Sequence, residues 1–422
     1  MTTARTDSDA AWLTWLCASR TSFAVMFTTY AASIPLLKPE WNLTGGEAGL
    51  IQSAWHIGYL FSLVAVGLLA DRHGAKRVFI ISSAISCVFS LLFAFFADGF
   101  FSAALLYGLT GLFSGGSYTP GLALIAERFQ SKGRGRAMGF YIAAASAGYA
   151  LALVITGAVT PLFGWRGAFI ANALGPLIGI ALALYALRAT PNVVHPRSAE
   201  QAAEKPVGVI LANKPVMLVT WAYTFHSWEM LGMKAWMPAF LAAAASYTTG
   251  SSATASASLG AGLAAIAYVG SMAGSITGGW LSDRMGRTWA MLLFATVSSS
   301  CSLLLGWMIG LPLWLLVVIC FVYSFAAVGD SSVFSTAATE LVPPRLIGAV
   351  YSVRSVLGFG AGALAPWVFG LVLDAAGAFQ SSPVVTWGLA WCSLGVIAMM
   401  SPVATWRLRR MPEAVQMAGG KR

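Results

Sequence analysis

The sequence predicts an all-α membrane protein with twelve transmembrane helices, arranged as two related six-helix halves. Two observations carry this prediction. Of the 422 residues, 58% are hydrophobic and only 9% are charged, whereas a soluble domain carries roughly 25% charged residues. One polar motif also occurs twice, at Gly67–Arg77 and again at Gly279–Arg287. The two copies indicate an internal repeat.

The predicted helices follow from the apolar segments. Crossing the hydrocarbon of a bilayer takes about 20 apolar residues in helical conformation. Twelve segments meet this requirement: 12–37, 47–70, 78–96, 99–126, 134–162, 166–188, 214–245, 257–281, 287–310, 311–341, 346–373 and 384–407. We therefore expect an N-terminal six-helix bundle over 1–188, a linker over 189–213 and a C-terminal six-helix bundle with a short tail over 214–422.

The distribution of positive charge predicts the orientation. A net charge of +10 would suggest a nucleic-acid partner in a soluble protein. Here most Lys and Arg residues gather in one set of alternate loops, and only Lys38 and Arg166 fall on the opposite side. By the positive-inside rule, both termini and the linker are cytoplasmic. We expect a multi-pass protein of the cell (inner) membrane that has the lipid bilayer, and not nucleic acid, as its partner.

Two further features are predicted from composition. The linker contains Pro191, Pro196 and Pro206 among mixed charges, which is typical of a flexible tether; a short surface helix is the alternative. The five cysteines lie in apolar segments without a close pair or a neighbouring His. We therefore expect no metal and no other cofactor.

The repeated motif predicts a tight polar turn between two helices. It reads Gly67-x-x-x-Asp71-Arg72-x-Gly74 in the first copy and Gly279-x-x-x-Asp283-Arg284-x-Gly286 in the second. These residues resemble the signature loop of the major facilitator superfamily of transporters. The segment Gly164-Trp165-Arg166-Gly167-Ala168-Phe169 likewise resembles the Trp-Arg-x-x-Phe element of that superfamily.

The resemblance implies a monomeric transporter that works by alternating access between two bundles, and not an enzyme. It also implies a conformational latch made of residues in the signature turns and of carboxylates at neighbouring helix ends: Asp71, Arg72, Glu127 and Arg136 in the first half, and Asp283, Arg284 and Glu340 in the second. The first copy departs from the family pattern, because Ala75 stands where a basic residue is usual. The alternative is that these charges only set the topology.

The predicted seventh helix holds the densest group of polar residues. Ionisable groups deep in a transmembrane helix are costly and are by default candidates for the transport pathway. This helix contains His226, Glu229 and Lys234 together with Trp228. At 100° per residue, His226 and Glu229 lie about 60° apart around the helix axis and so share one face, whereas Lys234 lies about 140° from Glu229. Pro238 removes a backbone hydrogen bond, so a kink or an unwound turn is expected.

Glu229 is the first choice for a proton carrier, because a carboxyl group in an apolar setting can take up and release a proton. A static salt bridge to a neighbouring helix is the alternative. Arg354 shares a helix face with Tyr351, and its guanidinium suits a carboxylate, sulfonate or phosphate group. The alternative for Arg354 is pairing with Asp330, a second candidate for proton coupling. Arg20 either faces the cavity or reaches the membrane interface by snorkelling.

These residues favour one function. Cations inside three predicted helices favour a small organic anion as substrate, carried with a proton that neutralises Glu229 or Asp330. The expected substrate-binding residues are Arg354, Lys234, His226, Tyr351, Trp228 and Arg20. The alternative is a proton-coupled exporter of amphipathic or toxic compounds. The family's drug antiporters usually carry an Arg in the fourth helix and Gly-Pro in the fifth, where this chain has Tyr107 and Gly148-Tyr149.

Overall fold

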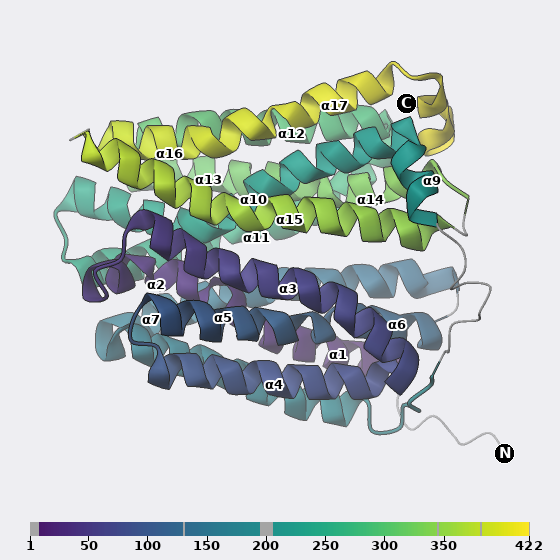
Figure 1. Cartoon of the computed structure of the whole chain (residues 1–422), viewed down its shortest axis with the longest axis horizontal. Helices are drawn as coiled ribbons and strands as arrows, with labels where there is room; N and C mark the ends of the chain where they lie inside the picture. The colour runs from purple at the N-terminus through teal and green to yellow at the C-terminus, as the bar shows by residue number, and fades with distance from the viewer. Residues whose placement is uncertain (1–7, 130, 195–205, 344–345, 380–381, 422) are drawn as a thin grey trace. The chain divides into compact units, whose positions relative to one another are not determined.

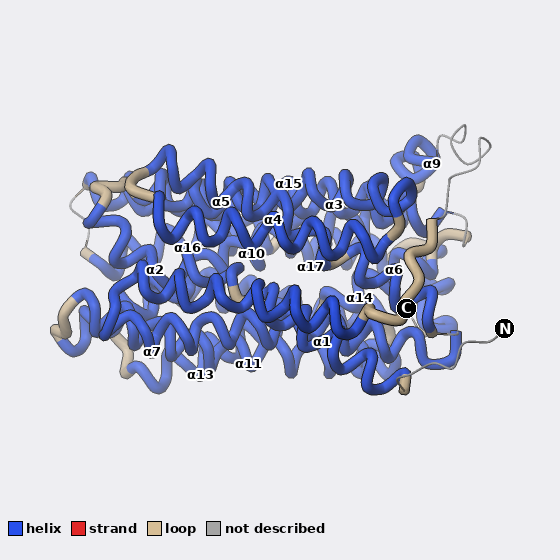
Figure 2. Tube along the Cα trace, turned by 90° about the horizontal axis from the view of Figure 1, so that it is seen from below, coloured by secondary structure: helices blue, strands red, loops and turns tan. Residues whose placement is uncertain are grey.

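The computed structural model describes residues 8–129, 131–194, 206–343, 346–379 and 382–421. These residues form helices joined by short turns, and no strand occurs among them (Figure 2). The chain forms two compact units. Unit 1 comprises Met1–Tyr30 and Ala54–Ala203, and unit 2 comprises Ala31–Ser53 and Glu204–Arg422. The bundle boundaries expected at residues 188 and 214 stay a prediction.

The helices are labelled in Figure 1. Those of the N-terminal half are α1 (Asp9–Ala24), α2 (Met26–Glu40), α3 (Gly45–His73), α4 (Ala75–Phe96), α5 (Phe100–Ser114), the 3-10 turn η1 (Gly115–Ser117), α6 (Thr119–Arg128) and α7 (Ser131–Ala186). Those of the C-terminal half are α9 (Pro206–Ala212), α10 (Lys214–Thr249), α11 (Ala253–Met285), α12 (Arg287–Leu305), η2 (Gly306–Met308), α13 (Leu313–Gly329), α14 (Ser331–Glu340), α15 (Ile347–Ala378), α16 (Pro383–Ala398), α17 (Met400–Arg409) and η4 (Pro412–Gly420).

Among the described residues, eight helical stretches are long and apolar enough to cross a membrane. One of them, 137–186, has 50 residues and includes two of the predicted spans. Gly164 interrupts it with a left-handed φ of 64°. The Asn172 side chain then donates a hydrogen bond of 3.0 Å to Thr156 Oγ1, whereas sixteen residues of straight helix would span about 24 Å. The chain therefore folds back at Gly164, as the spans 134–162 and 166–188 require.

Three other predicted spans are divided. The span 12–37 breaks between Ala24 and Met26, 99–126 passes through η1, and 311–341 breaks at Asp330 between α13 and α14. The breaks at η1 and Asp330 fall in corresponding helices of the two halves. They place polar residues in the middle of an otherwise apolar helix, which is where a transporter tolerates irregular backbone.

Both signature motifs form the tight turn that the sequence predicts. Gly74 lies between α3 and α4 with φ 86°, and Gly286 lies between α11 and α12 with φ 96°. Only glycine adopts this backbone conformation without strain. The equal conformation at equal positions confirms that the two motifs are structural repeats.

The linker contains the short helix α9 (Pro206–Ala212), so the alternative of a short surface helix is correct for this part. Residues 195–205 lie outside the described residues. The start of the linker contacts the first signature turn, where the Asn192 side chain donates to the His73 carbonyl and accepts from the Arg77 N–H, at 2.7 and 3.1 Å. Residues 190–194 are therefore tied to unit 1.

Close helix packing in unit 2 depends on glycines. Gly270, Gly274 and Gly278 recur every four residues on α11, on the side that packs against α13. A Cβ at Gly278 would lie 1.8 Å from the Gly329 carbonyl oxygen. Small residues at this spacing let transmembrane backbones approach each other, and here they bring α11 and α13 together up to Gly329, the residue before Asp330.

The helix α10 continues through Pro238 as a single element from Lys214 to Thr249, so the unwound turn expected there is not observed. Proline leaves the carbonyl four residues earlier without its helical partner. In this structure the Tyr268 hydroxyl donates a hydrogen bond of 3.1 Å to the Lys234 carbonyl. A partner from α11 thus satisfies the freed group, and the helix continues.

Candidate functional site

Arg20 is buried in unit 1. Its side chain extends from α1, is 6% exposed, and donates a hydrogen bond to the Ser117 hydroxyl in η1. The guanidinium carbon lies 5.4 Å from the ring centre of Tyr118 and 5.8 Å from that of Tyr141. Among the described residues, no carboxylate forms an ion pair with it. The snorkelling alternative is therefore not observed, because the charge points into the protein.

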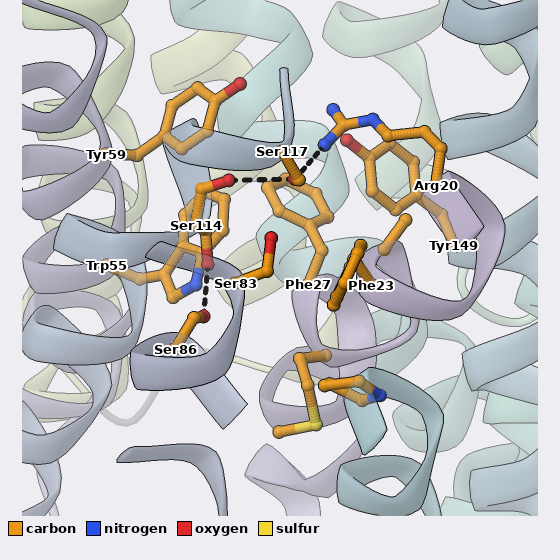
Figure 3. A pocket seen from close by; sticks show the side chains of 13 residues that line it. Arg20, Phe23, Phe27, Trp55, Tyr59, Ser83, Ser86, Ser114, Ser117 and Tyr149 are labelled. Carbon is orange, nitrogen blue, oxygen red and sulfur yellow. Dashed lines mark hydrogen bonds between the residues drawn. The ribbon is translucent and has the colours of Figure 1, made fainter. Parts of the chain in front are cut away.

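Arg20 lines a recess within unit 1 (Figure 3). The recess has a volume of about 30 Å³, which is room for a carboxylate group or for one or two waters. Its walls are aromatic rings, serine hydroxyls and small apolar groups from α1, α2, α3, α4, α5, η1 and α7: Phe23, Ala24, Met26, Phe27, Trp55, Tyr59, Ser83, Ser86, Ser114, Ser117, Tyr149 and Pro176. These groups surround a fixed positive charge.

The aromatic wall of this recess was not predicted from the sequence. Trp55 and Tyr59 are four residues apart on α3, and their rings stack with centres 5.1 Å apart and planes 10° apart. A spacing of four puts two side chains on one face of a helix. This spacing could have predicted that Trp55 and Tyr59 lie side by side. It could not have predicted that they line a recess, because two aromatic residues on one face are also common in ordinary helix packing.

Arg354 occupies a similar setting in unit 2. It is 9% exposed and donates a hydrogen bond of 2.7 Å to the Ser335 hydroxyl on α14. Its guanidinium carbon lies 4.2 Å from the ring centre of Tyr223 and 4.9 Å from that of Tyr351. Within the described part of the chain, no carboxylate pairs with it. Arg20 in unit 1 and Arg354 in unit 2 are therefore buried guanidiniums that each contact one serine and two tyrosines.

Asp330 pairs with His226 and not with Arg354. Its carboxylate is fully buried, and Oδ1 lies 3.0 Å from His226 Nδ1. The other ring nitrogen of His226 lies 2.9 Å from the Ser331 hydroxyl. The break between α13 and α14 thus presents a carboxyl group and a hydroxyl to the same imidazole of α10.

Glu229 is buried, with 2% of its surface exposed. One carboxylate oxygen accepts a hydrogen bond of 3.0 Å from the Ser298 hydroxyl of α12. Among the described residues, no cation forms an ion pair with Glu229, so the static salt bridge is not observed. Lys234 is half-buried on the same helix. Trp228 is buried, and its indole donates to the Ser393 carbonyl at 3.4 Å.

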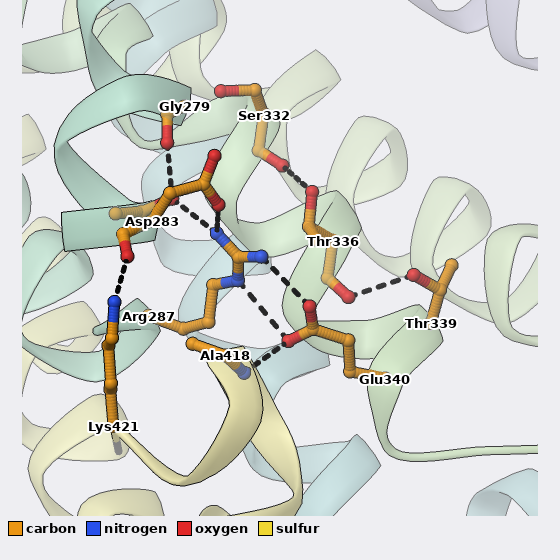
Figure 4. Close-up of polar contacts among 10 residues, drawn as sticks. Gly279, Asp283, Arg287, Ser332, Thr336, Thr339, Glu340, Ala418 and Lys421 are labelled. Carbon is orange, nitrogen blue, oxygen red and sulfur yellow. Dashed lines mark hydrogen bonds and ion pairs between the residues drawn. The ribbon is translucent and has the colours of Figure 1, made fainter. Parts of the chain in front are cut away.

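At the second signature turn, Arg287 contacts Glu340 (Figure 4). Its Nη2 lies 2.8 Å from Glu340 Oε1, and its Nε lies 3.2 Å from Oε2. Arg287 also donates to Asp283 and, at 2.7 Å, to the Ser282 hydroxyl. Arg284, the arginine predicted for this role, instead lies with its guanidinium carbon 3.9 Å from the Trp280 ring centre. In this structure Glu340 therefore pairs with Arg287, and the predicted latch role of Arg284 stays a prediction.

Three of the residues predicted to form the latch of the first half lie at helix ends. Asp71 is partly exposed and Arg72 exposed at the end of α3, and Glu127 is exposed in the last turn of α6. The Arg136 side chain lies outside the described residues. Trp165-Arg166 has a structural role at the other end of α4, where Arg166 donates to the carbonyls of Ala94 and Ala97 at 3.1 and 3.0 Å.

Two helical units with a repeated turn, and a buried guanidinium in each, define a membrane transporter with an internal repeat. The chain belongs to the Major Facilitator Superfamily, because the profile of that family matches residues 16–366. Its relatives in this family are transporters, so the protein is a transporter and not an enzyme.

Three relatives carry names of organic anions or lactones. The probable 4-methylmuconolactone transporter of Cupriavidus pinatubonensis is 32% identical over a matched segment. This segment covers only 31% of this chain and 30% of the relative. The cis,cis-muconate transport protein of Acinetobacter baylyi is 25% identical over 86% of this chain and 87% of the relative. The hexuronate transporter of Bacillus subtilis is 22% identical over 87% of this chain and 89% of the relative.

The fold has solved counterparts. A crystal structure of a bacterial homolog of the human lysosomal transporter Spinster, in an inward-facing and occupied conformation, matches with a TM-score of 0.72. The two sequences are 16% identical, and the match covers 95% of this chain and 97% of that one. This likeness shows the fold, an all-α membrane fold of the superfamily.

Proposed function

We propose that this protein is a secondary active transporter that moves a small organic anion together with a proton across the cell (inner) membrane, with both termini cytoplasmic and acting as a monomer. One observation carries the proposal: each unit buries a guanidinium that pairs with no carboxylate among the described residues, Arg20 in unit 1 and Arg354 in unit 2. A charged group inside a membrane-spanning helix costs roughly 2.5–3.5 kcal/mol on insertion scales. An anionic substrate would compensate these charges.

The relatives support an anionic substrate. Muconate and hexuronate, which appear in the names of two of them, both carry carboxylate groups. A guanidinium binds a carboxylate with two parallel hydrogen bonds. The serine and tyrosine side chains that contact each arginine carry no negative charge, so they do not compete with a substrate carboxylate for the guanidinium.

Proton coupling is assigned to Glu229 and Asp330. A carboxylate buried without a cation is costly unless it takes up a proton. Among the described residues, Glu229 accepts a hydrogen bond from the Ser298 hydroxyl and pairs with no cation, and Asp330 pairs with His226. We place the first proton step at Glu229, since Asp330 already has an imidazole to share its charge.

The contacts at the signature turns support a latch at the helix ends. In unit 2, Arg287 connects the turn to Glu340 at the end of α14. In unit 1, Asp71 and Glu127 occupy the matching places on α3 and α6. Charge-assisted contacts of this kind form in one conformational state and break in another.

Counterflow in proteoliposomes tests the function. A panel of carboxylates, sulfonates and lipophilic cations would be exchanged with and without an inward proton gradient. The proposal predicts that carboxylates exchange and that a proton gradient drives their net uptake. Exchange of lipophilic cations alone would contradict it and would favour an exporter of amphipathic compounds. For substitutions of the buried arginines Arg20 and Arg354, Arg188→Gln is the control variant, because Arg188 is exposed and lies outside the recess.

A further inference from the structure

The side chains of Arg20, Trp55 and Ser83 all line the recess (Figure 3). Among the described residues, Arg20 Nε, Trp55 Nε1 and Ser83 Oγ have no hydrogen-bond partner. Each side chain is more than nine-tenths buried. Buried polar groups are nearly always paired, so three unpaired donors in one recess indicate a missing acceptor. A carboxylate supplies two oxygens that accept and none that donates.

The other serine hydroxyls of the recess already donate to backbone carbonyls. Ser86 and Ser114 donate to the Thr110 carbonyl at 3.1 and 2.7 Å, and Ser117 donates to the Ser114 carbonyl at 2.9 Å. No Asp, Glu, Asn or Gln is among the described residues that line the recess. Hydroxyl oxygens are the side-chain acceptors that the described lining offers. The hydroxyl groups of a sugar acid that lay against the aromatic rings would be buried without a partner, which costs free energy.

Aromatic rings form the remaining wall. The Phe27 ring meets Trp55 edge-on, with ring centres 4.8 Å apart, and lies 4.5 Å from the centre of Tyr149. Trp55 in turn stacks on Tyr59. Such rings favour a flat π system placed offset or edge-on. The recess has a volume of about 30 Å³, so it accommodates the acid group and the atoms next to it, not a whole substrate.

We propose that this recess binds the carboxylate of a flat, unsaturated acid, aromatic or conjugated, and discriminates against polyhydroxylated sugar acids. The inference rests on the proposed function, because it specifies which organic anion the transporter takes. The Arg20 guanidinium, Trp55 Nε1 and Ser83 Oγ hold the carboxylate, and the rings of Phe27, Trp55 and Tyr149 contact the planar body beside it.

The test is competition against labelled benzoate in proteoliposome counterflow. Benzoate and cyclohexanecarboxylate have the same charge and nearly the same size, but only benzoate is flat. Benzoate is expected to compete at least tenfold better than cyclohexanecarboxylate, and at least a hundredfold better than gluconate or galacturonate. Sugar acids that compete as well as benzoate would overturn this inference and leave the proposed function standing. If no carboxylate exchanges, the proposed function itself fails.

Two variants at one position locate the preference. Trp55→Phe keeps a ring but removes the N–H donor. The affinity for every carboxylate should therefore fall by the same factor, and the preference for benzoate over cyclohexanecarboxylate should remain. Trp55→Leu removes the ring, and the preference should fall to less than threefold. An unchanged preference in Trp55→Leu would contradict the assignment. Trp55→Phe also shows whether the position tolerates substitution, and Ser83→Ala repeats the loss of a donor without disturbing the rings.

Discussion

The Arg287 guanidinium contacts both carboxylate oxygens of Glu340, at 2.8 and 3.2 Å. A second group, the Ala418 N–H of the C-terminal segment, donates to the same carboxylate at 3.0 Å. Glu340 therefore connects the signature turn, the end of α14 and η4. In the first half, the beginning of the linker contacts the signature turn through Asn192. The segment that follows each half thus braces the turn of that half.

Arg287→Gln is expected to destabilise the protein by about 1.5–3 kcal/mol, the usual contribution of a hydrogen bond to a charged group. The measurement is thermal unfolding in detergent. Arg284→Gln is the matched control, because Arg284 lies in the same turn but rests on Trp280, and it should change the free energy of unfolding by less than about 0.5 kcal/mol. Equal effects of the two substitutions would show that the pairing does not stabilise the turn.

Asp374 holds the beginning of α3 within unit 2. Its two carboxylate oxygens accept hydrogen bonds from the Gly45 and Gly46 N–H groups, at 2.6 and 2.7 Å. A carboxylate at a helix N-terminus satisfies free amides and interacts favourably with the helix dipole. Asp374→Ala should lower the stability of unit 2 by about 1–2 kcal/mol. Hydrogen exchange at the Gly45 and Gly46 amides should quicken, and unchanged exchange would refute the capping role.

Close backbone contact at the same place predicts a second effect. A Cβ at Gly370 would lie 2.0 Å from the Gly45 carbonyl oxygen. Gly370→Ala should therefore separate α3 from α15 and lower the Tm. Gly377→Ala, on the same helix with open space around the added methyl, is the control and should leave the Tm nearly unchanged. A similar Tm for both variants would contradict the close approach.

Glu229→Gln should separate exchange from coupling. The amide keeps the Ser298 contact at 3.0 Å but cannot release a proton. Counterflow of the anion should remain within about threefold of the unsubstituted protein, whereas uptake driven by the proton gradient should fall at least tenfold. Retained gradient-driven uptake would move the proton step to Asp330, and loss of both activities would indicate a structural role.

Much of the fold could be predicted from the sequence. Apolar length alone gave the helices, because hydrocarbon thickness fixes how many residues cross it. The glycines of the two signature motifs gave the turns, since only glycine adopts the φ found at Gly74 and Gly286 without strain. The continuous helix through Pro238 could not be predicted, because it depends on a hydroxyl from α11, Tyr268, reaching the freed carbonyl.

The site was less predictable. Spacing along one helix placed His226 and Glu229 on a shared face, but their partners Asp330 and Ser298 come from other helices. The same limit applies at the second signature turn, where Arg287 contacts Glu340 and Arg284 lies on Trp280, because both arginines are close to the turn in sequence. Burial of Arg20 depends on η1 and α7, which supply Ser117 and Tyr141 around it.

The most direct test of anion transport is the affinity of the transporter for benzoate in counterflow, compared between the unsubstituted protein, Arg20→Lys and Arg20→Gln. Arg20→Gln should weaken the affinity for benzoate by about 10- to 100-fold, the effect of losing hydrogen bonds to a charged group. Arg20→Lys should weaken it less, since lysine keeps the charge but cannot make two parallel hydrogen bonds. If Arg20→Gln is folded and its affinity is unchanged, this buried guanidinium does not bind the substrate.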